Sequence, residues 1–194
     1  MKILVAVPTF ETITPDTFKS IYYLEKGEHE LAFDFVKGYD CAKARNDIGK
    51  RTLDGGYDAV LMVDSDMIVP KDAIVKLAEK PFDLVLGCYP KKNTKDGAVE
   101  LFRLGKANYV DFYRYSELGE DRFIVKGGGF GCALVNAKLF KALKFPWFKY
   151  VVYDSGSLLS EDLFFCDNAR KAGFVIDADP RVRCGHLTRY FQYD

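Results

Sequence analysis

The stretch VLMVDSDMIVP, residues 60–70, is the most informative part of this sequence. It begins with the apolar run 60–63, which is typical of a strand buried on both faces of a parallel sheet. Two carboxylates one residue apart, Asp64 and Asp66, follow that run directly. Because like charges repel and a buried unpaired charge is costly, we expect a positive group close to this pair.

Apolar strands and amphipathic helices alternate on both sides of this stretch. Apolar runs predict strands at 2–8, 30–38, 58–64 and 82–89. Capping residues, prolines and glycines predict helices over 14–27, 41–56 and 70–80. This order predicts an α/β fold, Rossmann-like, with a mostly parallel central sheet flanked by helices. Such sheets bind ligands at the carboxyl ends of their strands, where the acidic pair falls.

The second half of the sequence is more β-rich. After a polar, basic loop at 90–98, short strands are expected at 99–104, 109–115 and 122–136. Helices are expected at 137–144 and 160–173, separated by an aromatic connection at 145–157, and the last strands at 174–186. No linker or repeat interrupts the chain, so the 194 residues predict one domain with a mixed second half.

Composition excludes some classes of function. The 28 basic residues balance 28 acidic ones, so there is no clear nucleic-acid-binding patch. No apolar run approaches the roughly 20 residues that a membrane span needs, so we expect no transmembrane segment. The cysteines are odd in number and lack a CxxC pair, which is typical of reduced, mostly buried thiols. Together these features predict a cytoplasmic protein.

Two interpretations of Asp64 and Asp66 stay open on the residues alone. They would cap the turn before the helix near Pro70, or hold Mg²⁺ or Mn²⁺ together with phosphate oxygens. Their place at the end of the most apolar strand favours the cation. His186 follows the last strand and is a candidate third ligand, although a lone histidine is more often structural.

The other charged groups have equally open interpretations. Glu161 and Asp162 suit the first turn of a helix capped by Ser160, or one of them is a general base. Arg45 and Asn46 begin a helix as solvated residues or as ligand contacts. The remaining basic residues are surface charge or reach a diphosphate: Lys91, Lys92, Arg181, Arg183 and Arg189.

The glycine-rich stretch KGGGFG, residues 126–131, is not a phosphate loop. It lacks the pattern GxxxxGK[ST], and a strand-like segment follows it where a dinucleotide fingerprint needs a helix. We expect these glycines to allow close approach of the backbone to a flat ligand.

Taken together, the sequence resembles the glycosyltransferases of the GT-A fold, close to the family-2-like group. The matching stretches span nearly the whole chain in the family's order: VAVPTF, AKARNDI, YDAVLMVDSDMIVP, GGGFGCALV, SEDLFFCDNARKAGF and CGHLTR. The resemblance implies a minimal catalytic domain over 1–194. Residues 1–89 would be its nucleotide-binding half and residues 90–194 its acceptor-binding half.

The resemblance also implies a role for each matching residue. Asp162 would be the catalytic base, with Glu161 assisting, and Asp64, Asp66 and His186 would hold Mn²⁺ or Mg²⁺. The nucleotide-sugar site would be lined by Pro8, Thr9, Phe10, Arg45, Asp64, Ser65, Gly128, Gly129 and Phe130. The family's acidic uracil contact has no clear match here. Asp34 and Asp40 are both candidates, so the nucleobase stays open.

The function implied is metal-dependent transfer of a sugar from a nucleotide-diphosphate donor, a UDP-sugar first, to an acceptor hydroxyl with inversion. Three alternatives remain: a retaining transferase, a nucleotidyltransferase that makes sugar nucleotides, or a catalytically silent binding module. A nucleotidyltransferase would want a basic, glycine-rich loop after the first strand, and PTFETIT has none. The acceptor and the oligomeric state are not indicated. Composition also makes the loop around Lys91 and Lys92 a candidate lid over the donor.

Overall fold

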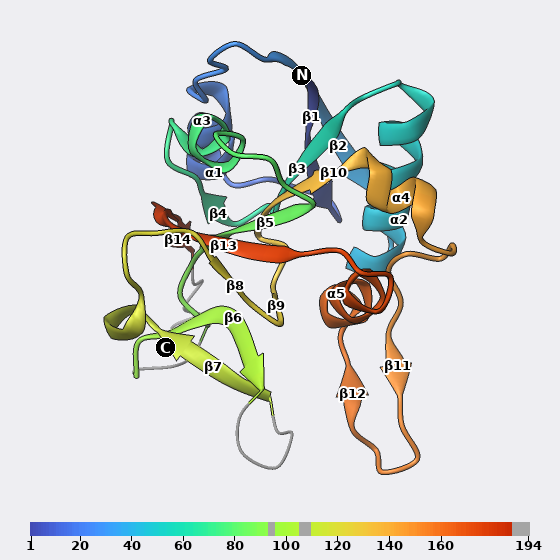
Figure 1. Ribbon diagram of the computed structural model, residues 1–194. Coiled ribbons are helices and arrows are strands. Elements are labelled where there is room, and N and C mark those ends of the chain that lie inside the picture. The colour runs from blue at the N-terminus through green and yellow to red at the C-terminus, as the bar shows by residue number, and fades with distance from the viewer. Residues whose placement is uncertain (93–95, 105–109, 188–194) are drawn as a thin grey trace, which may run out of the picture.

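A sheet of seven strands runs through the centre of the molecule (Figure 1). The computed structural model describes residues 1–92, 96–104 and 110–187. In spatial order the strands are β2 (Glu30–Lys37), β1 (Lys2–Thr9), β3 (Ala59–Val63), β10 (Cys132–Asn136), β5 (Leu84–Cys88), β13 (Ile176–Arg183) and β8 (Phe123–Ile124). β10 and β8 run opposite to the other five. The predicted mostly parallel α/β sheet is therefore confirmed.

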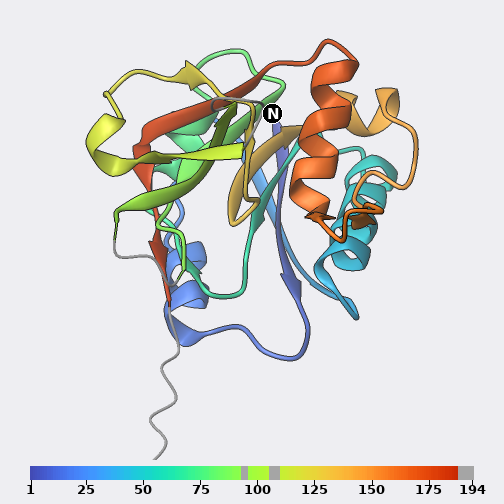
Figure 2. The same ribbon diagram turned by 90° about the horizontal axis from the view of Figure 1, so that it is seen from below.

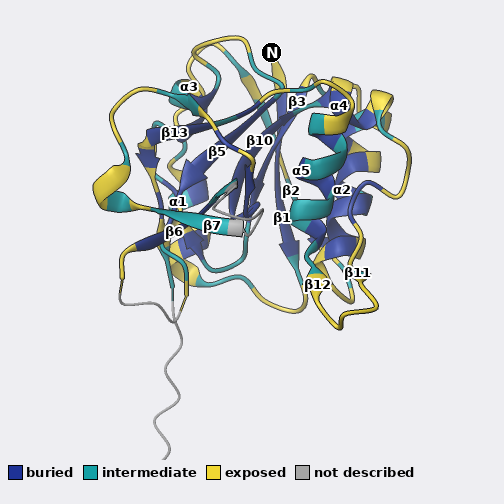
Figure 3. Cartoon of the chain, turned by 60° about the horizontal axis from the view of Figure 1, so that its bottom comes forward, coloured by how far each residue is buried: buried dark blue, intermediate teal, exposed yellow. Residues whose placement is uncertain are grey.

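Helices cover both faces of this sheet. In Figure 1, α1 (Pro15–Tyr22) and α3 (Ala73–Leu77) lie on one side, and α2 (Cys41–Asp54) and α4 (Ala137–Ala142) on the other. α5 (Glu161–Lys171) lies beside α2, as Figures 1 and 2 both show. Side chains alternate between the faces of a strand, so each face of the sheet builds its own core. This explains why the central strands are apolar throughout and dark blue in Figure 3.

Local sequence signals account for most helix boundaries. The Asp40 side chain accepts a hydrogen bond from the Lys43 amide at 2.8 Å and so begins α2, which ends at Gly55. The Thr14 hydroxyl caps α1, with Pro15 in its first turn. Two helices are shorter than expected, because α1 ends at Tyr22 and α3 spans only five residues.

Smaller sheets surround the carboxyl end of the central one. β7 (Val110–Arg114), β6 (Ala98–Leu104) and β9 (Gly127–Gly128) form a three-stranded sheet, and the 3₁₀ turn η2 (Tyr115–Glu117) follows it. β11 (Val151–Val152) and β12 (Leu158–Leu159) make a hairpin inside the expected aromatic connection. β4 (Met67–Ile68) pairs with β14 (Gly185–His186). This pairing places the last strand of the chain next to the segment that follows β3.

Two further observations concern membrane-spanning helices and cysteines. Within the described ranges, no helix is both long enough and apolar enough to pass through a bilayer. All five cysteines are free, and four of them are buried, as expected; Cys41 is exposed.

Candidate functional site

A pocket of about 390 Å³ opens at the carboxyl ends of the parallel strands β1, β3 and β5. This is the edge at which α/β sheets bind ligands. Its lining comes from seven separate segments of the chain: Pro8, Asp64, Ser65, Asp66, Tyr89, Lys92, Glu100, Phe102, Gly129, Ser160, Asp162 and His186. Seven predicted site residues therefore share one pocket: Pro8, Asp64, Ser65, Asp66, Gly129, Asp162 and His186.

The guanidinium of Arg45 lies beneath this pocket and is only 2% exposed. It donates to Glu161 Oε1 at 2.6 Å, to Asp64 Oδ1 at 2.9 Å and to Asp162 Oδ1. The Phe130 ring packs 5.6 Å from it. Arg45 is thus the positive group that the acidic strand end requires, although Asp66 does not contact it. Burial opposes its charge, yet the three carboxylates hold the Arg45 pKa well above its usual range.

Asp162 is the most perturbed acid of the site. Burial raises its pKa to about 7, Arg45 opposes the rise, and the charges of Glu161 and Asp64 add to it. Its side chain remains 18% exposed to the pocket. Arg45 holds Oδ1, and Oδ2 accepts only a long 3.4 Å bond from the Phe130 amide. A carboxylate with one fixed oxygen and a pKa close to neutrality is suited to proton transfer.

Glu161 serves a different purpose from Asp162. Its side chain is 7% exposed, and it does not line the pocket. Ser160 occupies the cap position of α5, but its side chain makes no capping hydrogen bond. Glu161 and Asp162, the two acids in the first turn of α5, both form ion pairs with Arg45. A favourable interaction with the helix dipole does not by itself account for these ion pairs.

Asp66 and His186 form a second group at the pocket. The pairing of β14 with β4 sets His186 beside Met67, and the Leu187 amide donates to the Asp66 carbonyl at 2.9 Å. His186 Nε2 then lies 3.7 Å from Asp66 Oδ1. The other carboxylate oxygen of Asp66 accepts a hydrogen bond from the Lys92 ammonium.

The tautomer of His186 suits a metal ligand. Its Nδ1 lies 2.8 Å from the Pro90 carbonyl oxygen, which only accepts, so Nδ1 carries the proton. The Nε2 lone pair consequently faces Asp66, an arrangement in which a backbone carbonyl orients a ligating histidine. Within the described ranges, no three His, Cys, Asp or Glu side chains form a ready metal cluster. Asp66 and His186 thus fit a hard divalent cation that takes its other ligands from phosphate or water.

The glycines of residues 127–131 make room for the protein's own side chains. A Cβ on Gly129 would overlap the Tyr89 hydroxyl, and one on Gly128 would lie 2.6 Å from the Glu100 carbonyl oxygen. The Tyr89 hydroxyl accepts a hydrogen bond from the Gly131 amide at 3.0 Å. These glycines were expected to let a flat ligand approach the backbone. In the structure, the groups that approach the backbone of Gly128 and Gly129 are Tyr89 and strand β6. Phe130 is fully buried in the core, away from the pocket.

Other predicted residues lie at the edge of the site or outside it. The Thr9 hydroxyl donates to the Thr12 carbonyl, and Phe10 is 61% exposed. Asn46 holds the chain at Trp147 and Phe148 through their backbone groups, so it is a structural residue.

Neither candidate for the uracil contact lines the pocket. Asp34 pairs with Arg51 at 2.5 Å, and Asp40 caps α2. Arg181 pairs with Glu79 and Asp179, and Arg183 donates to the Pro180 carbonyl. Arg189 lies outside the described residues.

Three of the lining residues had no clear signal in the sequence: Tyr89, Glu100 and Phe102. Tyr89 follows β5 at the carboxyl edge, and Glu100 and Phe102 alternate along β6. A period of two residues places Glu100 and Phe102 on one face of a strand, which was a usable signal. Without the pairing of β6, however, that face could not be assigned to the pocket.

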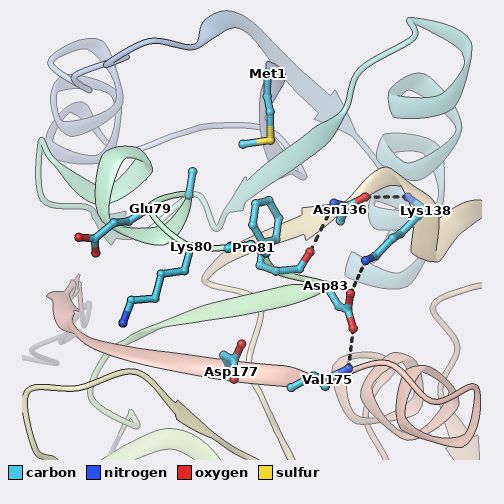
Figure 4. Close-up of a pocket in the computed structure, with 11 residues that line it drawn as sticks. Met1, Glu79, Lys80, Pro81, Asp83, Asn136, Lys138, Val175 and Asp177 are labelled. Atoms are coloured by element: carbon cyan, nitrogen blue, oxygen red, sulfur yellow. Dashed lines mark hydrogen bonds and ion pairs between the residues drawn. The ribbon is translucent and has the colours of Figure 1, made fainter.

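A larger pocket of about 590 Å³ lies at the amino ends of the strands, far from these residues (Figure 4). Its polar groups largely satisfy one another. Asp83 accepts from the Val175 amide and pairs with Lys138 at 2.5 Å, while the Asn136 side chain bonds Phe82 and Lys138. Asp83 and Lys138 pair with each other and Glu79 pairs with Arg181, so this pocket is a weaker candidate than the smaller one.

Solved structures share this arrangement of strands and helices. A197 from STIV matches at a TM-score of 0.66 and 18% identity, covering 97% of this chain and 87% of that one. GalNAc-T7 with UDP, GalNAc and Mn²⁺ matches at 0.65 and 10% identity, covering 97% of this chain and 44% of that one. S. aureus TarS 1–349 with UDP-GlcNAc matches at 0.57 and 16% identity, covering 99% and 60%.

The chain has the GT-A fold. The GT-A fold here spans less than half the length of the GalNAc-T7 chain and about three-fifths of the TarS chain. No protein-family model matches the sequence, and no curated protein matches it. At 10–18% identity these likenesses establish the fold alone.

Proposed function

We propose that this protein is a metal-dependent glycosyltransferase that moves a sugar from a nucleotide-diphosphate donor, a UDP-sugar first, to an acceptor hydroxyl. The observation that carries the proposal is the shared guanidinium of Arg45, which joins Asp64 at the end of β3 to Asp162 at the start of α5. Arg45 thereby holds Asp162, whose pKa is about 7, close to Asp64 at the end of β3 in a GT-A fold.

Charge balance supports the need for a cation. Four of the pocket's lining residues are acids, namely Asp64, Asp66, Glu100 and Asp162, and one is a lysine. A donor diphosphate is itself an anion, so it would be repelled from this pocket unless positive charge were added. Asp66 and His186 would hold that cation, Mn²⁺ or Mg²⁺, with Asp64 close by. When bound, the metal would supply Lewis-acid neutralisation of the diphosphate as it leaves.

The chemistry of the remaining residues follows from their positions. Asp162 would accept the proton of the acceptor hydroxyl at Oδ2, because Arg45 holds Oδ1. The hydroxyl oxygen would then bond the anomeric carbon of the sugar as the bond to the diphosphate breaks. A base on one face and a leaving group on the other give inversion. A positioned general base contributes about 10²–10⁴-fold in rate.

The structural neighbours support the choice of donor. The GalNAc-T7 structure holds UDP, GalNAc and Mn²⁺, and the TarS structure is a complex with UDP-GlcNAc. The unpaired cysteines favour a reducing, cytoplasmic location. We further propose the division of labour implied by the sequence, with residues 1–89 binding the nucleotide and residues 90–194 the acceptor.

A thermal-shift screen of UDP-, GDP- and TDP-sugars, with and without Mn²⁺, tests the proposal. A ligand that binds only the native state raises stability by about 2.7 kcal/mol at 100 times its Kd. We expect a shift with a UDP-sugar that requires Mn²⁺ and is lost in Asp66→Asn. Arg51→Met, whose exposed pair with Asp34 lies outside the pocket, should respond as the wild type does. No shift with any donor would overturn the proposal.

A further inference from the structure

The carboxylate of Asp66 already carries a protein cation. One of its oxygens accepts from the Lys92 ammonium, and the other faces His186 Nε2 at 3.7 Å. Lys92 follows β5, 26 positions along the chain from Asp66, and both side chains are accessible, at 42% and 31% exposure. The contact therefore forms at the mouth of the pocket, where a metal ion or a diphosphate can reach it.

This contact conflicts with the role of Asp66 as a metal ligand. Lys92 engages Oδ2 and leaves Oδ1 open beside His186, but the positive charge of the ammonium repels a divalent cation that binds the same carboxylate. We propose that Lys92 competes with the metal for Asp66 in the absence of donor, and binds the donor's diphosphate once the metal has displaced it. This inference rests on the proposed function.

The geometry allows Lys92 to exchange one partner for the other. Lys92 and Asp66 line the same pocket, and a lysine side chain is long, flexible and able to bind phosphate as a point charge. Lys91 has a different environment, because its ammonium lies 3.5 Å above the Phe112 ring. The two neighbouring lysines thus differ in position, although they carry equal charge.

The exchange links metal binding to donor binding. When a metal binds Asp66, the Lys92 ammonium is released and can bind the diphosphate. When the diphosphate binds the Lys92 ammonium, Asp66 is left free to bind the metal. Each ligand must then raise the affinity of the other by the same factor. Lys92 would thus bind the donor's diphosphate when the donor is present and pair with Asp66 when it is absent.

The test uses three proteins of residues 1–194: wild type, Lys92→Met and Lys91→Met. Mn²⁺ affinity is measured by the electron paramagnetic resonance signal of free Mn²⁺, with and without UDP, and UDP affinity by calorimetry at saturating Mn²⁺. We expect Lys92→Met to bind Mn²⁺ alone about three- to fivefold tighter, because an ion pair of this exposure is lost. UDP should bind it about tenfold more weakly, because one charge-assisted contact is lost.

Lys91→Met separates competition from a general loss of positive charge. It removes one charge from the same segment and leaves the partner of Asp66 in place, so its Mn²⁺ affinity without UDP should stay within about twofold of wild type. The inference is overturned if Lys92→Met binds Mn²⁺ no tighter than wild type, or if both variants change alike. If wild type binds no Mn²⁺ even with UDP, the metal part of the proposed function fails instead.

Discussion

Arg45 and Glu161 are 116 positions apart in the chain, and their side chains meet at 2.6 Å in the interior of the molecule. The contact joins the first turns of α2 and α5, which cover the same face of the central sheet. Both side chains are at least 93% buried, so each needs the other's charge. The pocket therefore rests on an ion-pair network that is part of the folded core.

Replacing Arg45 with methionine should destabilise the protein severely. Three carboxylates would lose their counter-charge, and breaking a buried pair costs about 3–5 kcal/mol. Urea unfolding followed by circular dichroism measures the effect. Arg51→Met is the matched control, because its pair with Asp34 is exposed and should contribute about 1 kcal/mol or less. Equal losses from the two substitutions would contradict the central role of Arg45.

Asp162→Asn should abolish sugar transfer and preserve donor binding. In the wild type the rate should rise with pH through about 7, because the base acts only when deprotonated. Donor hydrolysis or transfer, measured from pH 5 to 9, gives the profile, and calorimetry gives the affinity. Unchanged turnover in the variant would assign the base elsewhere.

The same carboxyl group makes stability depend on pH. Its pKa is about 7 in the folded state and about 4 in an unfolded chain, so the folded state binds the extra proton between these values. Its contribution to stability is present in full below pH 4 and is lost as pH rises to 7. The free energy of unfolding of the wild type, measured by urea denaturation, should fall relative to that of Asp162→Asn across this window by about 4 kcal/mol. Parallel curves for the two proteins would refute the raised pKa.

Gly129→Ala should destabilise the fold by about 1–3 kcal/mol, the usual cost of overpacking. The new methyl group would overlap the Tyr89 hydroxyl, which is buried. Tyr89→Phe in the same chain should relieve part of the clash, although the Gly131 amide then loses its acceptor. Gly119→Ala is the control, since no atom lies within 4 Å of its added Cβ. Thermal unfolding of the wild type and these three variants measures the effect.

His186→Ala should raise the Mn²⁺ concentration needed for donor binding by at least about tenfold, the usual effect of losing a metal contact. His186→Gln retains a hydrogen bond to the Pro90 carbonyl and removes the imidazole, so it separates metal binding from support of the loop. The measurement is the UDP-induced thermal shift across a Mn²⁺ titration. Identical titrations for wild type and both variants would leave His186 a structural residue.

Much of the fold was predictable because its signals are local. The run ending at Asp64 is buried at every position of β3, and Asp40 and Gly55 bound α2. The direction of β10 was not predictable, because an apolar run of five residues looks the same in a parallel or an antiparallel strand.

The site was only partly predictable, because its contacts join distant segments. Asp64, Asp66, Asp162 and His186 could be placed at strand and helix ends, and the structure brings all four to one pocket. Their partners depend on tertiary packing. A first-turn acid such as Glu161 is equally compatible with a helix dipole and a buried arginine, so its contact with Arg45 left no local signal.

The position of β10 also constrains how the protein is made. β3 and β5 are consecutive long strands of the sheet, yet β10 lies between them and pairs with both. During synthesis, the edges of β3 and β5 that pair with β10 stay unpaired until Asn136 has left the ribosome. β13 and β14 are synthesised later still, and β14 carries His186 to Asp66. The pocket is therefore incomplete in the nascent protein until residues up to His186 have been translated.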